Sequence, residues 1–103
     1  MIFMTSALQD IQSAIIPVLQ KYPIRRASLF GSFADGTAHE NSDVDLLIEL
    51  TQSIGLLEFI HIKHELEDAL GRKVDLLEFK AVKPLLKKYI IDNALPVYGQ
   101  EAA

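Results

Sequence analysis

Two carboxylates one residue apart, Asp43 and Asp45, predict chemistry more clearly than any other part of this 103-residue chain. They stand at the start of an apolar run, Val-Asp-Leu-Leu-Ile. Because residues i and i+2 of a strand project from one face, we expect the two side chains to lie side by side. Adjacent carboxylates repel each other unless a proton or a cation lies between them. A hard divalent metal such as Mg²⁺, which prefers oxygen ligands and often binds substrate phosphates, is the expected occupant. The alternative is a solvated strand entrance, which the low preference of Asp for strands disfavours.

A Gly-Ser pair, Gly31-Ser32, follows the apolar residues Leu29-Phe30 a short distance upstream of the carboxylates. A turn at this position can present backbone N–H groups to phosphate oxygens, and glycine permits a close approach of the backbone. The alternative is an ordinary strand-to-helix turn in which Ser32 caps the following helix.

A third acidic residue, Asp75, lies in the later apolar stretch Lys-Val-Asp-Leu-Leu, residues 73–77. If this stretch is a strand beside the first two motifs, Asp75 adds a third oxygen ligand or a general base. The alternative is that Asp75 is a solvent-facing residue of an edge strand.

In this order and spacing, the motifs resemble the signature of the nucleotidyltransferase superfamily related to DNA polymerase beta. More narrowly, they resemble the minimal nucleotidyltransferases often encoded beside a HEPN-type protein. The resemblance implies catalytic and metal-binding roles for Asp43, Asp45 and Asp75, with Mg²⁺ as the metal and ATP as the co-substrate. It also implies that Gly31 and Ser32 contact the phosphates of the nucleoside triphosphate. The implied reaction transfers a nucleoside monophosphate, expected to be AMP, to a hydroxyl group.

The resemblance also implies a protein partner, a HEPN-family toxin, for which this chain is the antitoxin. The length leaves no room for a separate acceptor-binding domain, so we expect the acceptor to come from the partner or from a homo-oligomer interface. One residue departs from the family pattern, because Asp35 stands where the family commonly has a basic residue. This departure keeps open an alternative, a catalytically weak antitoxin that neutralises its toxin by binding alone.

Composition predicts a single domain spanning residues 1–103, since the length suits one domain and half of the residues are hydrophobic. The net charge is −4, which disfavours direct nucleic-acid binding because such proteins are more often basic. The absence of cysteine is compatible with a reducing cytoplasm. No signal peptide and no apolar run long enough to span a membrane is recognisable, so we expect a cytoplasmic protein without a membrane partner.

The lysines are concentrated toward the C-terminus of the chain. Two interpretations stay open for this cluster, namely solubility of a helix surface or a docking patch for an acidic partner. Its members are Lys73, Lys80, Lys83, Lys87 and Lys88.

The apolar periodicity predicts alternating helices and strands, and therefore an α/β (α+β) fold with a small mixed sheet of three to four strands covered by helices. A Ser-x-x-Gln capping box at Ser6 predicts the start of the first helix, and Pro17 predicts a kink or break inside it. The expected helices span residues 6–22, 54–70 and 84–93, and the expected strands span 24–30, 44–50 and 73–79, with a short edge segment at 96–98.

Overall fold

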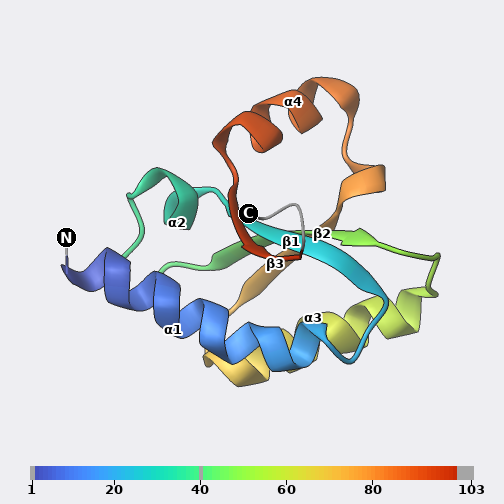
Figure 1. Ribbon diagram of the computed structural model, residues 1–103, viewed down its shortest axis with the longest axis horizontal. Helices are drawn as coiled ribbons and strands as arrows, with labels where there is room; N and C mark the ends of the chain where they lie inside the picture. The colour runs from blue at the N-terminus through green and yellow to red at the C-terminus, as the bar shows by residue number, and fades with distance from the viewer. Residues whose placement is uncertain (1, 40, 100–103) are drawn as a thin grey trace.

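Four strands and four helices alternate along the chain in a computed structural model that describes residues 2–39 and 41–99 (Figure 1). The strands form one mixed sheet in the order β3-β2-β1-β4. The predicted fold class is therefore confirmed. The elements are α1 (Ile2–Leu19), β1 (Ile24–Phe30), α2 (Ser32–Asp35), β2 (Val44–Leu50), α3 (Leu56–Leu70), β3 (Val74–Glu78), the 3₁₀ turn η1 (Phe79–Ala81), α4 (Pro84–Asn93) and β4 (Leu95–Tyr98).

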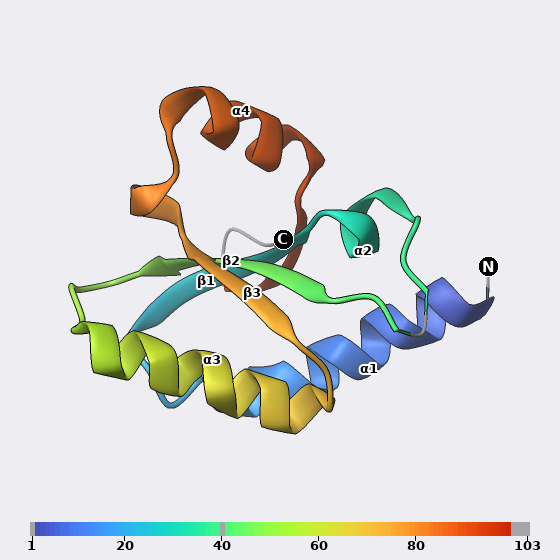
Figure 2. The same ribbon diagram turned by 180° about the vertical axis from the view of Figure 1, so that it is seen from behind.

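The strand pairing decides which ends of the strands meet. β1 runs antiparallel to β2, and β2 runs parallel to β3. The carboxyl end of β1 and the amino ends of β2 and β3 therefore lie at the same edge of the sheet (Figure 2). This edge carries all three motifs that the sequence singles out.

The main hydrophobic core lies between one face of the sheet and helices α1 and α3, which cover that face together (Figures 1 and 2). Each completely buried aliphatic side chain of this core contributes about 1.5–3 kcal/mol through removal of apolar surface from water. The best-buried members come from both helices and the central strands: Ile15, Leu19, Leu29, Val44, Ile48, Ile62 and Leu66.

A second, smaller cluster lies on the opposite face, where α4 and the segment before it pack on β2. Its buried members are Leu47, Val82 and Ile90. The alternation of β2 places Leu47 on the same face as Asp45. The acid-bearing face of β2 is therefore open at Asp45 and covered by apolar side chains one step further along the strand.

The predictions for strands 24–30 and 44–50 and for helix 84–93 are confirmed at both ends. The boundaries predicted for the first helix are wrong, because α1 begins at Ile2 and ends at Leu19. The predicted capping box at Ser6 is also wrong, since this residue lies inside the helix. The helix continues past Pro17 to Leu19, so the break expected at this residue does not occur. No helix of the described residues is long and apolar enough to cross a membrane.

Candidate active site

The carboxylates of β2 and β3 meet at the sheet edge because of the strand register. Asp45 is the direct partner of Asp75 in the parallel β2–β3 ladder, and Phe30 is its partner on β1. Paired residues of neighbouring strands project from the same face, so the carboxyl groups of Asp45 and Asp75 lie next to each other. The structure thus brings two of the three predicted acids together from segments thirty residues apart in sequence.

The electrostatic consequence appears at Asp45, whose carboxyl is partly buried. Burial, followed by the negative charge of Asp75, a hydrogen bond with Asp75 and the charge of Asp43, raises the pKa of Asp45 to about 6. A carboxyl with this pKa is largely protonated at mildly acidic pH. At higher pH it is ionised and is repelled by the neighbouring carboxylates. A bound cation would remove the repulsion, which is the behaviour expected of a metal ligand.

Gly31 is joined to Asp45 by direct contact. Its φ of 70° and ψ of −144° lie in a region that glycine alone adopts without strain. A Cβ atom placed on Gly31 would lie 2.2 Å from Oδ2 of Asp45, closer than any non-bonded contact. The Asp45 carboxylate therefore occupies space that any side chain at position 31 would fill.

Ser32 is the first residue of α2, and Gly31 is the N-cap. The first hydrogen bonds of this turn run from the N–H groups of Ala34 and Asp35 to the carbonyl of Gly31, each at 3.0 Å. The N–H groups of Ser32 and Phe33 precede them and have no acceptor within the helix. Helix α2 has no side-chain capping hydrogen bond, so the structure does not show the alternative capping role of Ser32.

Asp43 lies immediately before β2 and is exposed, as is Asp75. Among residues 2–39 and 41–99, no group of three or more His, Cys, Asp or Glu side chains is arranged closely enough to hold a metal on its own. The donor set nevertheless suits Mg²⁺, because this ion is usually bound by one or two carboxylates together with waters and substrate phosphates. Asp43 and Asp45 supply such oxygen donors, with Asp75 beside them.

Asp35, at a position where the resemblance leads us to expect a basic residue, lies in a local turn. Its Oδ1 atom accepts hydrogen bonds from the Thr37 backbone N–H at 3.0 Å and from the Thr37 hydroxyl at 2.6 Å. These bonds lower the pKa of Asp35, so its carboxylate stays ionised at neutral pH. The Asp35 carboxylate thus adds a fixed negative charge within the first turn of α2.

Arg72 contacts two segments of the predicted site, although no sequence motif singles it out. Its guanidinium donates a hydrogen bond to the Ser42 carbonyl at 3.0 Å and lies 5.5 Å from the centre of the Phe33 ring. Arg72 thereby connects the start of β3 with the loop before Asp43 and with α2. The sequence carried no signal for this contact, because the groups it joins are thirty or more positions apart.

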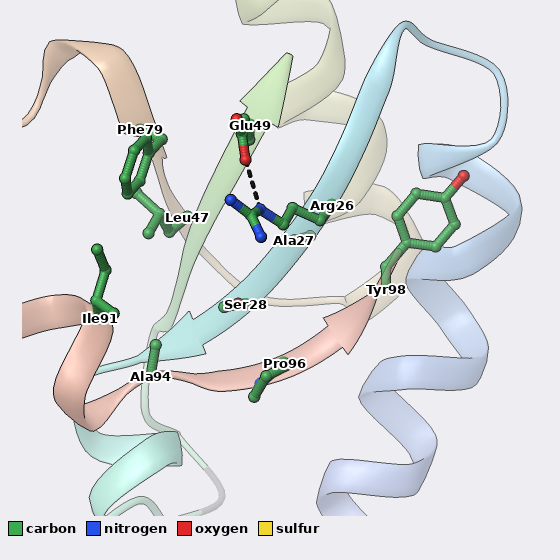
Figure 3. Close-up of a pocket in the computed structure, with 10 residues that line it drawn as sticks. All are labelled: Arg26, Ala27, Ser28, Leu47, Glu49, Phe79, Ile91, Ala94, Pro96 and Tyr98. Atoms are coloured by element: carbon green, nitrogen blue, oxygen red, sulfur yellow. Dashed lines mark hydrogen bonds and ion pairs between the residues drawn. The ribbon is translucent and has the colours of Figure 1, made fainter. Parts of the chain in front are cut away.

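A pocket of about 210 Å³ lies on the same face of the sheet, at the other end of β1 and β2 (Figure 3). Arg26 and Glu49, which form an ion pair, line it together with Ser28, Tyr98 and apolar residues of α4 and β4. None of the five residues predicted for the active site lines this pocket. Leu47, buried in the second cluster, lies between Asp45 and Glu49 along β2.

The sequence profile described as "Polymerase beta, Nucleotidyltransferase" matches residues 13–103. The chain belongs to this family of polymerase beta-type nucleotidyltransferases. The family resemblance and the enzyme class predicted from the motifs are therefore confirmed.

Within the family, the chain is similar to protein adenylyltransferases. It is 41% identical over 90 residues to MJ0435 of Methanocaldococcus jannaschii, which has a provisional protein adenylyltransferase name, and the match covers 87% of this chain and 97% of the relative. It is 32% identical over 94 residues to the protein adenylyltransferase MntA of Thermococcus cleftensis, covering 87% and 95% of the two chains.

Solved structures show the same architecture. A provisionally named minimal nucleotidyltransferase superposes with a TM-score of 0.77 at 31% identity, covering 88% of this chain and 93% of that one. A complex of the tri-AMPylated HEPN toxin of Shewanella oneidensis with its MNT antitoxin contains a chain that superposes with a TM-score of 0.73. The latter match covers 91% of this chain and 74% of that one at 19% identity, so it shows a shared fold alone.

Proposed function

We propose that this chain is a Mg²⁺-dependent protein adenylyltransferase that transfers AMP from ATP to a hydroxyl group of a HEPN-family toxin and thereby acts as its antitoxin. We place it in the cytoplasm as a single minimal nucleotidyltransferase domain, residues 1–103. The observation that carries the proposal is the contact of Asp45 with both other motifs. This carboxylate lies against Gly31 on one side and is the strand partner of Asp75 on the other.

In the proposed reaction, the acceptor hydroxyl oxygen forms a bond to the α-phosphorus of ATP. The bond between the α-phosphorus and the bridging oxygen of pyrophosphate breaks, and pyrophosphate leaves. Asp75 takes the proton of the acceptor hydroxyl as general base. Its exposure supports this role, since the hydroxyl of a macromolecular acceptor must reach it from outside.

The phosphates are bound by the other residues of the site. Asp43 and Asp45, with Asp75 beside them, would hold Mg²⁺, and the bound ion would supply positive charge to neutralise and orient the triphosphate. The backbone of Gly31 can approach the phosphates closely because it has no side chain, and Ser32 donates hydrogen bonds from its N–H and hydroxyl. Most of the rate enhancement then comes from positioning and from neutralisation of charge.

Relatives support the partner and the nucleotide. A relative from Thermococcus cleftensis is named a protein adenylyltransferase, and a toxin in complex with a chain of the same fold is AMPylated.

The proposal is tested by incubation of the purified chain with Mg²⁺, a HEPN-family partner and ATP labelled in either the α- or the γ-phosphate. We expect label from the α-position, and not from the γ-position, to appear on the partner. Asp45→Asn should abolish the transfer, whereas Asp68→Asn, which changes an exposed acid of α3, should retain it. Transfer of the γ-label would instead indicate phosphorylation, and equal transfer by the Asp45 variant would remove the reaction from this site.

A binding-only antitoxin is the second candidate, and the surface of α4 favours it. Leu85, Leu86 and Tyr89 lie on one side of this helix and are 91%, 52% and 66% exposed. Apolar side chains gathered on a helix surface are typical of a protein contact. The two candidates differ in whether neutralisation of the toxin requires Asp43 and Asp45.

A further inference from the structure

The segment proposed to bind the phosphates carries an excess of negative charge. Residues 31–45 contain four acidic residues and no lysine or arginine. Asp75 adds another carboxylate from β3. A triphosphate brings several more negative charges, so a cationic side chain from another segment would favour its binding beside the metal.

The strand register places Lys73 on the acid-bearing face. Val44 is the partner of Val74, and the Val44 N–H donates a hydrogen bond to the Lys73 carbonyl at 3.0 Å. Lys73 therefore lies next to Asp43 at the sheet edge. Because side chains alternate along a strand, Lys73 projects from the same face as Asp75, whereas Val74 points into the core.

Lys73 is also available for a ligand. Its side chain is exposed, and within the described parts of the chain it forms no ion pair, although Asp43 is its neighbour. Lys21, Lys63 and Lys88, in contrast, are paired with Glu65, Glu67 and Asp92. Arg72, the other cation at this edge, is engaged by the Ser42 carbonyl and the Phe33 ring.

We propose that Lys73 binds the phosphates of the nucleotide and supplies the positive charge that the segment from Gly31 to Asp45 lacks. This inference rests on the proposed function and adds a phosphate-binding residue to the same site. It also assigns Lys73 a role that the other C-terminal lysines do not share. Lys80, for example, lies in η1 after the far end of β3, about 17 Å or more away along a strand of this length.

The inference is tested by calorimetric titration of Mg·ATP into the wild-type chain and into Lys73→Gln, Lys73→Arg and Lys80→Gln. Loss of a charge-assisted hydrogen bond should weaken the affinity of Lys73→Gln by about 10- to 100-fold. Lys73→Arg keeps the charge and should stay within a few-fold of the wild type. Lys80→Gln should bind normally, and all variants should melt at the wild-type temperature, since the side chains of Lys73 and Lys80 are both exposed.

Equal affinities of Lys73→Gln and Lys80→Gln would overturn the inference, as would equal losses in Lys73→Gln and Lys73→Arg. Titration of Asp45→Asn separates this failure from that of the proposed function. If Asp45→Asn abolishes binding and Lys73→Gln does not change it, only the role of Lys73 is refuted. If the wild type does not bind Mg·ATP, the proposed function fails and the inference fails with it.

Discussion

Replacement of Asp45 by Asn should stabilise the metal-free protein, although it removes a residue of the active site. The pKa of Asp45 is raised from 3.8 to about 6, chiefly by burial and by the charge of Asp75. A shift of this size corresponds to at most about 3 kcal/mol of unfavourable free energy for the ionised form. Because the carboxyl is partly exposed and solvent screens its interactions, we expect about 1–2 kcal/mol in practice.

The sign of the pH dependence follows from the direction of the shift. A carboxyl whose pKa is raised in the folded state contributes stability below the unfolded pKa and loses that contribution as the pH rises through about 6. Asn has no such titration. The difference in free energy of unfolding between Asp45→Asn and the wild type should therefore be near zero at pH 4. Above pH 7 this difference should be largest, with the variant the more stable protein.

The assay is thermal and urea unfolding in EDTA at pH 4.5 and pH 8. For a domain of this size, about 1–2 kcal/mol raises the melting temperature by about 5–9 °C. The control is Asp68→Asn, which should change the melting temperature little at either pH. Addition of Mg²⁺ should stabilise the wild type and not Asp45→Asn. An Asn variant that is equally stable or less stable than the wild type at pH 8 would refute the argument that these carboxylates repel each other.

Two further variants test the other members of the site. Asp75→Asn should leave Mg·ATP affinity close to that of the wild type but lower the rate of AMP transfer by at least ~100-fold, as expected for a general base, and single-turnover kinetics measures this. Gly31→Ala should destabilise the protein by more than the ~1–3 kcal/mol of backbone strain alone, because its Cβ also collides with Asp45, and urea unfolding measures the loss. Gly36→Ala is the matched control, since Gly36 also has a positive φ of 85° but no atom lies within 4 Å of the added Cβ. If both glycine variants lose the same free energy of unfolding, the predicted collision of the Cβ with Asp45 does not destabilise the protein.

The strands and the motifs could be predicted from the sequence because their signals are local. The alternation of Val44, Leu46 and Ile48 with Asp45 specifies both the strand and its buried face. The family resemblance then implied that Gly31 and Asp75 belong beside Asp45. The structure supplies the physical link, which is the missing Cβ of Gly31 and the register of β2 with β3.

Other features depend on contacts that no local pattern encodes. The hydrophobic alternation of β2 did not predict that Leu47, on the acid-bearing face, would be buried by Val82 and Ile90 from a later segment. The bond between Arg72 and Ser42 depends likewise on the parallel pairing of β2 with β3.

The central claim is that neutralisation of the toxin is a chemical modification carried out by the Asp43–Asp45 site. The most direct measurement is the intact mass of a HEPN partner purified from cells that co-express it with this chain or with the Asp43→Ala/Asp45→Ala variant. With the wild type, we expect the toxin to gain mass in whole-number multiples of a nucleoside monophosphate and the cells to survive. With the variant, we expect an unmodified toxin and loss of protection, although the two proteins still co-purify. Full protection by the variant, together with an unmodified toxin in both cases, would contradict the enzymatic account and show that binding alone neutralises the toxin.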